Sequence, residues 1–123
     1  MKIKVIKPLN NILKKNYFNW KENIFPKKKR LFNKLIDKGQ KPEFMVLSCS
    51  DSRVNISSIF NEVEGKFFTH RNIANIVPAY ERKKINNCTG SVLEYAVNTL
   101  YVKNIIILGH SNCGGVKAFY DNK

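Results

Sequence analysis

The sequence has no apolar stretch longer than four residues, far short of the ~20 that a membrane-spanning helix needs. Its first ten residues contain lysines but neither an apolar segment nor a small-residue cleavage site, so we expect no secretory signal and a cytoplasmic protein. Only three cysteines occur in 123 residues, and an odd number cannot all pair within one chain. We therefore expect neither a membrane protein nor a disulfide scaffold, and interpret the cysteines as metal ligands or core residues.

Acidic residues are also scarce, because nine Asp and Glu stand against 22 Lys and Arg, for a net charge of +13. Residues 1–45 hold 13 of these basic side chains and only three acidic ones. A basic segment of this kind can attract nucleic acid. However, Lys, Asn and Ile together supply 47 of the 123 residues, and only four of the bases are arginine, the residue that reads bases and phosphates best. We interpret the charge as biased composition on a solvated surface and expect no nucleic-acid partner.

The length fits one domain, and 43% apolar residues are enough to build a core. We predict a single domain over residues 1–123, made of an N-terminal helical arm (1–39) and an α/β core (40–123). In the arm, helical spacing predicts two basic amphipathic helices, one ending near Trp20 and one over Lys27 to Lys38, with Pro26 breaking the chain between them and Gly39 ending the second. Their apolar faces are formed by Leu9, Ile12, Leu13, Tyr17, Trp20, Leu31, Leu35 and Ile36.

In the core, short apolar runs predict strands over residues 44–47, 66–71 and 104–109. Between the second and third runs, apolar residues at i, i+3 and i+4 predict a helix from Gly90 to Tyr101, and a short terminal helix follows from Val116. The third run is β-branched without alternation, which is typical of a strand covered on both faces. The fold class is therefore α/β, with a mainly parallel sheet flanked by helices.

Two polar loops follow two of these strands, and open α/β sheets place their sites at the carboxyl ends of the strands. The first loop carries Cys49 and Asp51, and the second carries His110 and Cys113. Two thiolates and one imidazole can bind zinc and leave a fourth position for water, as catalytic zinc sites do. Asp51 with Arg53 could equally be a simple loop ion pair. We interpret the other candidates as structural, Cys88 at a helix start and His70 within a strand.

These motifs resemble the β-class carbonic anhydrases. The segment CSDSRV from Cys49 and the segment HxxCGG from His110 both match the family. Residues 65–78 are similar to its central segment, and residues 91–97 to its following helix. The match covers about Gln40 to Val116, in the same order and spacing, and residues 39–46 resemble the plant-type branch. Position 46 is Val, where the bicarbonate-inhibited bacterial branch carries tryptophan, so we expect no inhibitory bicarbonate site.

The resemblance implies a role for each matching residue. Cys49, His110 and Cys113 would hold one Zn²⁺ per chain. Asp51 would accept a hydrogen bond from the zinc-bound water while Arg53 holds its carboxylate, and in a closed state Asp51 would be the fourth ligand. Gln40 would hydrogen-bond the substrate, and Phe68 and Tyr95 would line the pocket across a dimer interface.

The implied function is reversible hydration of CO2 to bicarbonate and a proton by a zinc-bound hydroxide, as part of carbon utilisation by a homodimer or larger homo-oligomer. Two alternatives stay open from the sequence. One is a non-catalytic, zinc-stabilised remnant of the fold that acts as a binding module, and the other is a hydrolase of a related small substrate such as carbon disulfide. Chains of the family continue beyond the point that corresponds to Lys123. We therefore expect a form that lacks the C-terminal part of the fold, exposes apolar surface and associates readily.

Overall fold

The computed structural model describes residues 8–61, 64–80 and 87–121. Residues 1–7, which make up most of the ten-residue segment where the sequence predicts no secretory signal, lie outside the described residues. The chain divides into two compact units, Met1–Gly39 and Gln40–Lys123. Among the described residues, no helix has both the length and the apolar character of a membrane span.

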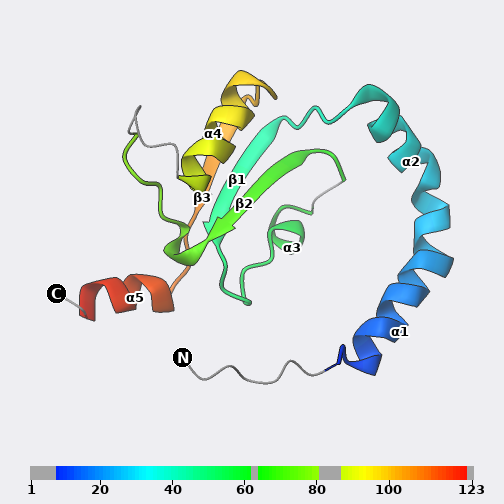
Figure 1. Cartoon of the computed structure of the whole chain (residues 1–123), viewed down its shortest axis with the longest axis horizontal. Coiled ribbons are helices and arrows are strands. Elements are labelled where there is room, and N and C mark those ends of the chain that lie inside the picture. The colour runs from blue at the N-terminus through cyan, green and yellow to red at the C-terminus, as the bar shows by residue number, and fades with distance from the viewer. Residues whose placement is uncertain (1–7, 62–63, 81–86, 122–123) are drawn as a thin grey trace. The chain divides into compact units, whose positions relative to one another are not determined.

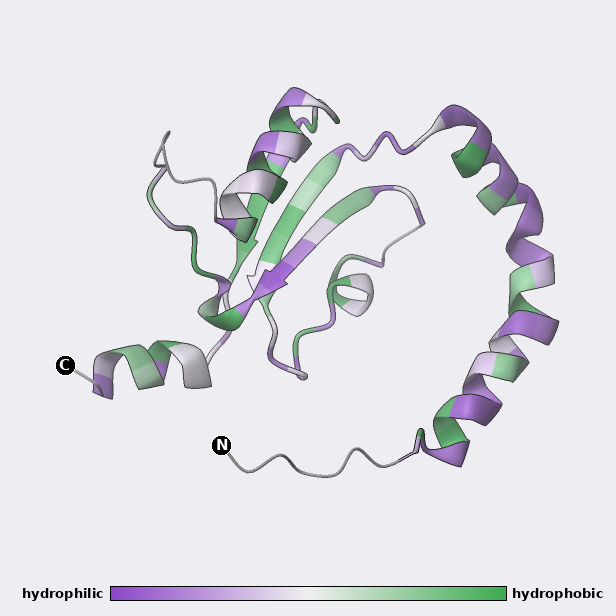
Figure 2. Cartoon of the chain, viewed as in Figure 1, coloured by the Kyte–Doolittle hydropathy of each residue, from purple (hydrophilic) through white to green (hydrophobic). Residues whose placement is uncertain are grey.

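The first unit is helical from residue 11 to residue 38 (Figure 1). Helix α1 (Asn11–Asn19) is capped by the Asn10 side chain, which accepts a hydrogen bond of 2.8 Å from the main-chain N–H of Ile12. A π-helical turn, Trp20–Ile24, joins it to α2 (Phe25–Lys38), and Gly39 ends α2 with a left-handed φ of 65°. No described residue of α1 or α2 is buried. Most residues of the predicted apolar faces are exposed, and Leu31 and Leu35 are partly buried. Figure 2 shows the hydrophobic and hydrophilic residues of these helices by colour.

The predicted break at Pro26 is wrong. Pro26 lies in the first turn of α2, where a residue has no intrahelical partner for its N–H and proline is therefore tolerated. The wider π-helical turn immediately before it lets the chain stay helical through this point.

The second unit contains a three-stranded parallel sheet with strand order β2-β1-β3. Its strands are β1 (Phe44–Cys49), β2 (Phe67–Asn72) and β3 (Asn104–Leu108). β1 is the central strand, with a neighbouring strand on each edge, and its residues 45–48 are completely buried. This confirms the predicted α/β class with a parallel sheet. All three carboxyl ends therefore lie at the same edge of the sheet.

Helices connect the strands. Along the chain, α3 (Ile56–Phe60) follows β1, and α4 (Cys88–Asn98) follows β2 and contacts it (Figure 1). α4 begins two residues before the predicted Gly90, because the Asn87 side chain accepts a hydrogen bond of 3.1 Å from the Gly90 N–H. It ends before the predicted Tyr101, whose φ of 54° is incompatible with a continuing helix. A last helix, α5 (Gly114–Asp121), follows β3.

The expectation that β3 is covered on both faces is wrong for the described structure. β3 pairs only with β1 among the described strands, and Ile105 and Ile107 remain 44% and 56% exposed. The unalternated apolar run therefore indicated a strand correctly but overstated its burial.

Candidate metal centre

The parallel sheet brings the two sequence motifs together at one edge. β1 ends at Cys49, and β3 ends at Leu108, two residues before His110. Because Ser48 and Leu108 are paired in the sheet register, the loops that follow these strands start side by side. Cys113 closes the second loop directly before α5 begins at Gly114.

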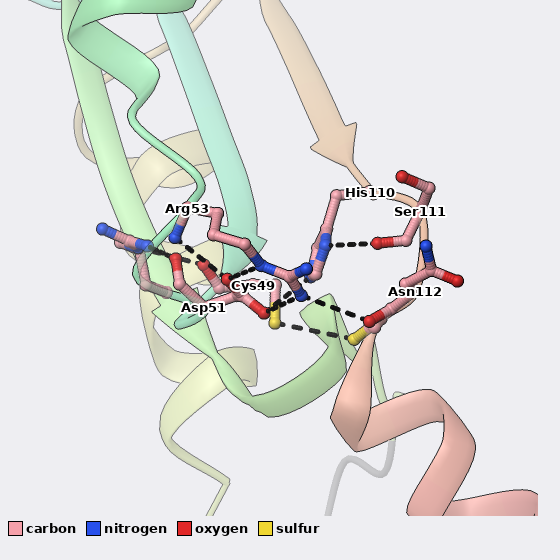
Figure 3. Close-up of polar contacts among 8 residues, drawn as sticks. Cys49, Asp51, Arg53, His110, Ser111 and Asn112 are labelled. Atoms are coloured by element: carbon pink, nitrogen blue, oxygen red, sulfur yellow. Dashed lines mark hydrogen bonds and ion pairs between the residues drawn. The ribbon is translucent and has the colours of Figure 1, made fainter.

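The three predicted zinc ligands form one cluster. Figure 3 labels two of them, Cys49 and His110. One donor atom each from Cys49, His110 and Cys113 lies within 4.8 Å of the other two, and the two sulfur atoms are 3.7 Å apart. Both cysteines are buried, at 4% and 8% exposure, and the imidazole is 14% exposed. It is the only cluster of metal-binding side chains found in the described parts of the chain.

The chemistry of His110 fits a metal at this position. Its Nδ1 lies 3.0 Å from the carbonyl oxygen of Ser111, which can only accept a hydrogen bond, so Nδ1 carries the proton. Nε2 is then the bare nitrogen, and it is buried without a hydrogen-bond partner. A buried acceptor without a partner is costly unless something binds it. An imidazole held through its other nitrogen and flanked by two thiols is a donor set typical of zinc.

Cys49 is prepared to bind as a thiolate. Its pKa is lowered to about 7, mainly by the main-chain N–H of Asp51. Burial of the sulfur acts in the opposite direction, and the main-chain N–H of Ala74 and the Cys113 side chain lower the pKa further. Since the thiolate is the metal ligand, a substantial fraction of Cys49 is in the binding form near neutral pH.

Asp51 and Arg53 form the predicted pair. Arg53 donates from Nε to Asp51 Oδ1 at 2.9 Å and from Nη2 to Oδ2 at 2.7 Å, and its main-chain N–H also donates to Oδ1. Nη2 further contacts the carbonyl oxygen of Asn112, which ties the pair to the second loop (Figure 3). These bonds hold the pKa of Asp51 well below its usual range and raise the pKa of Arg53.

The Asp51 carboxylate is oriented towards the cluster without belonging to it. Its Oδ2 lies 3.8 Å from Nε2 of His110, whereas the metal-binding group consists of the two cysteines and the histidine. Because Arg53 holds both carboxylate oxygens, a metal bound by the two cysteines and the histidine would keep its fourth position free in this conformation. The role of Asp51 as a fourth ligand stays a prediction.

The three predicted substrate residues do not lie at the metal cluster of their own chain. Gln40 precedes β1, at the end of the strand opposite to Cys49. Phe68 pairs with Met45, four positions before Cys49, which is about 13 Å along a strand. Its ring is 6.0 Å from that of Tyr95 on α4, so these two aromatic residues do form one group. Their contribution to a substrate pocket stays a prediction.

Sequence reasoning missed three residues that support the cluster. Arg71 donates to the main-chain carbonyl oxygens of Cys49 and Asp51. Ala74, with a left-handed φ of 59°, directs its N–H to the Cys49 sulfur. Gly115 allows α5 to approach the turn that contains Ala74. Each contact depends on strand register or close packing, and no spacing in the sequence indicates it.

We predict that Gly115→Ala destabilises the protein. A Cβ atom at Gly115 would lie 2.6 Å from Cγ2 of Ile73 and 3.0 Å from Cβ of Ala74, so the turn would have to move. Overpacking of this kind lowers the free energy of unfolding by about 1–3 kcal/mol. Denaturant unfolding of the zinc-loaded protein measures the change. Gly114→Ala is the matched control, because a Cβ there meets nothing within 4 Å. Equal stability of the two variants would contradict the prediction.

Comparison with known proteins places this site in a family. The sequence profile of the carbonic anhydrase family matches residues 44–123. The chain is 45% identical over 105 residues to β-carbonic anhydrase 3 of Arabidopsis thaliana, covering 85% of this chain and 40% of that protein. It is 49% identical over 79 residues to the chloroplastic β-carbonic anhydrase 5 of the same plant, covering 64% and 26%.

Solved structures agree with the sequence comparisons. The β-carbonic anhydrase CcaA superimposes with a TM-score of 0.81 at 34% identity, over 89% of this chain and 48% of CcaA. A tetrameric β-carbonic anhydrase from Sordaria macrospora gives 0.69 at 41% identity, over 87% and 51%. The fold and the donor set define an α/β protein with a site suited to zinc. With the comparisons, they show that the chain belongs to the β-carbonic anhydrase family. It spans about half, or less, of the length of these relatives.

Proposed function

We propose that this chain binds one zinc ion through Cys49, His110 and Cys113 and takes part in the reversible hydration of CO2 to bicarbonate. The observation that carries the proposal is the cluster of three donors within 4.8 Å, beside a carboxylate that Arg53 holds in place. Membership of the β-carbonic anhydrase family supports the same reaction and substrate.

When bound, zinc would act as a Lewis acid that lowers the pKa of a coordinated water, a property for which carbonic anhydrases are themselves the standard example. The chain supplies the environment for this chemistry. The two cysteine thiolates would balance the charge of the ion, and the Ser111 carbonyl fixes the orientation of the imidazole. The low pKa of Asp51 keeps its carboxylate ionised at neutral pH, so it can only accept a hydrogen bond. Asp51 therefore orients an O–H group in the site and disfavours a bare oxygen beside it.

The experiment that tests this function is CO2 hydration by stopped flow on the full chain. We expect hydration above the uncatalysed rate when the protein carries one zinc per chain, loss of the activity after chelation, and recovery when zinc is restored. A protein that binds zinc but does not hydrate CO2 would overturn the proposal in favour of a non-catalytic binding module. Turnover of carbon disulfide in place of CO2 would favour the hydrolase alternative.

We also propose that the functional unit contains at least two copies of the chain. Gln40, Phe68 and Tyr95 lie away from the metal cluster of their own chain, so they can serve as substrate residues only in the site of a second copy. Half-exposed apolar residues on β3, such as Ile107, also favour association. The Sordaria macrospora relatives are described as tetrameric.

Free thiols at all three cysteines are in keeping with a reducing compartment, and a cytoplasmic location stays a prediction.

We predict that two defective chains restore each other. Cys113→Ser removes the metal, while Gln40→Ala keeps the metal and loses one substrate hydrogen bond, worth ~0.5–1.5 kcal/mol. In a mixed dimer every zinc lies on the Gln40→Ala chain and would face an intact Gln40 of its partner. Activity per zinc should therefore return to the wild-type value in mixed dimers isolated with two different affinity tags. A monomer in light scattering, or no recovery in the mixed dimers, would contradict the shared site.

A further inference from the structure

Arg71 makes two hydrogen bonds that connect β2 to the loop carrying Cys49 and Asp51. It is the penultimate residue of β2. Its Nε donates to the carbonyl oxygen of Cys49 at 3.0 Å, and its Nη2 donates to the carbonyl oxygen of Asp51 at 2.8 Å. One planar guanidinium thus holds two main-chain oxygens of a single loop, and a lysine with its single ammonium group cannot reproduce this geometry.

These two carbonyl groups belong to the residues that supply the thiolate and the carboxylate of the site. The main-chain N–H of Asp51 donates to the Cys49 sulfur, so the orientation of this part of the backbone matters directly to the sulfur. The intervening residue is fixed as well, because the N–H of Ser50 donates to the carbonyl oxygen of Asn72 at 2.8 Å. The main chain of β2 therefore holds the N–H group of Ser50, and the Arg71 side chain holds the carbonyl groups of Cys49 and Asp51.

A purely structural role explains this arrangement less well. Arg71 is exposed, and the Asp51 carbonyl oxygen lies in the loop after β1, where water could satisfy it at little cost to the fold. Water would not impose one orientation on the two carbonyl groups. The guanidinium does, because its donors are fixed relative to one another.

We propose that Arg71 is a positioning residue of the metal site. It sets the backbone of the loop so that the Cys49 thiolate and the Asp51 carboxylate face the metal position together. Arg53 holds the Asp51 carboxylate directly, whereas Arg71 acts through the main chain. This inference rests on the proposed zinc site.

The test compares Arg71→Met and Arg71→Lys with the control Lys66→Met. Lys66 directly precedes β2, at the end away from the metal cluster, and removing it changes the charge by the same amount. The full chain is loaded with zinc for affinity measurements by chelator competition, and with Co²⁺ for absorption spectroscopy. Supporting a metal ligand from outside its coordination sphere is typically worth 10–100-fold in metal affinity or activity.

For Arg71→Met we expect about 10-fold to 100-fold weaker zinc binding or lower kcat, with KM little changed, and a shifted Co²⁺ spectrum. Arg71→Lys should recover part of the affinity but not the wild-type spectrum. Lys66→Met should match the wild type in every respect. A wild-type spectrum and zinc affinity in Arg71→Met, whatever its thermal stability, would overturn the inference.

The metal readouts separate this inference from the proposed activity. If the wild type binds zinc and Co²⁺ but does not hydrate CO2, the proposed function fails, while a shifted Co²⁺ spectrum in Arg71→Met still supports the positioning role. If the wild-type chain binds neither metal, the positioning role is overturned as well.

Discussion

Replacing Cys113 with serine should reduce zinc from one ion per chain to about zero and abolish CO2 hydration with it. The substitution removes one of only two sulfur donors in the cluster, and a serine hydroxyl remains protonated and is a poor zinc ligand. Serine is similar in size to cysteine, so the buried position beside α5 should remain filled. Cys49→Ser should give the same loss, because the two sulfurs are equivalent members of the group. Metal analysis of the purified variants measures the effect.

Cys88 provides the matched control for this result. It is an exposed free cysteine at the start of α4 and does not belong to the metal-binding group. Cys88→Ser should therefore keep one zinc per chain and full activity. Full zinc content in Cys113→Ser would show that the donor set is assigned wrongly. Loss of zinc in Cys88→Ser would point to a metal site that includes this residue.

The metal cluster could be predicted because the topology of the parallel sheet brings its residues together. Once residues 44–49 and 104–108 are parallel neighbours, the loops that start at Cys49 and after Leu108 must begin at the same edge of the sheet. Two cysteines and one histidine in those loops then limit the chemistry to a small set of metals. Asp51 and Arg53 are close in sequence, so their ion pair requires no tertiary information at all.

The supporting contacts could not be predicted, because they depend on register and packing at atomic detail. Arg71 reaches the first loop only because β2 pairs with β1 so that Asn72 lies opposite Cys49. Shifting that register by one residue would direct Arg71 to the other face of the sheet. The close approach of Gly115 to Ala74 likewise requires the left-handed turn at Ala74, a conformation that alanine rarely adopts.

The errors in the fold prediction have equally local causes. Proline breaks a helix when it lies in the interior, which is why Pro26 is predicted to end one. In the first turn of α2 it removes no intrahelical hydrogen bond, so the helix is not disturbed. The apolar run of β3 predicts a buried strand, but burial depends on which elements cover the strand. The described residues cover β1 more completely than β3. The short helix α3 has no apolar periodicity long enough to detect, and only the Asn55 cap, which accepts from the Ser58 N–H at 3.2 Å, marks it.

Asp51→Asn should keep zinc but lose most CO2 hydration activity, by about 10²- to 10³-fold in kcat, as is typical when one preorganised polar group is removed. Asparagine has the same shape, and its oxygen would take the Oδ1 position, which accepts two hydrogen bonds from Arg53. Its NH2 group would then take the Oδ2 position, which lies 3.8 Å from His110 Nε2. The site would then present a donor where an acceptor is needed. Zinc should remain because Asp51 is outside the metal-binding group.

Steady-state hydration kinetics and metal analysis on the same preparation test this prediction. We expect kcat and kcat/KM to fall together while zinc stays at one ion per chain, the signature of an interaction that is made in the transition state. Asp37→Asn on α2 is the matched control, because it makes the same change at an exposed carboxylate that belongs to neither sequence motif, and it should leave the kinetics unchanged. Wild-type kcat in Asp51→Asn would reduce the Asp51–Arg53 pair to a loop ion pair, and zinc loss in that variant would instead show that the carboxylate is a ligand.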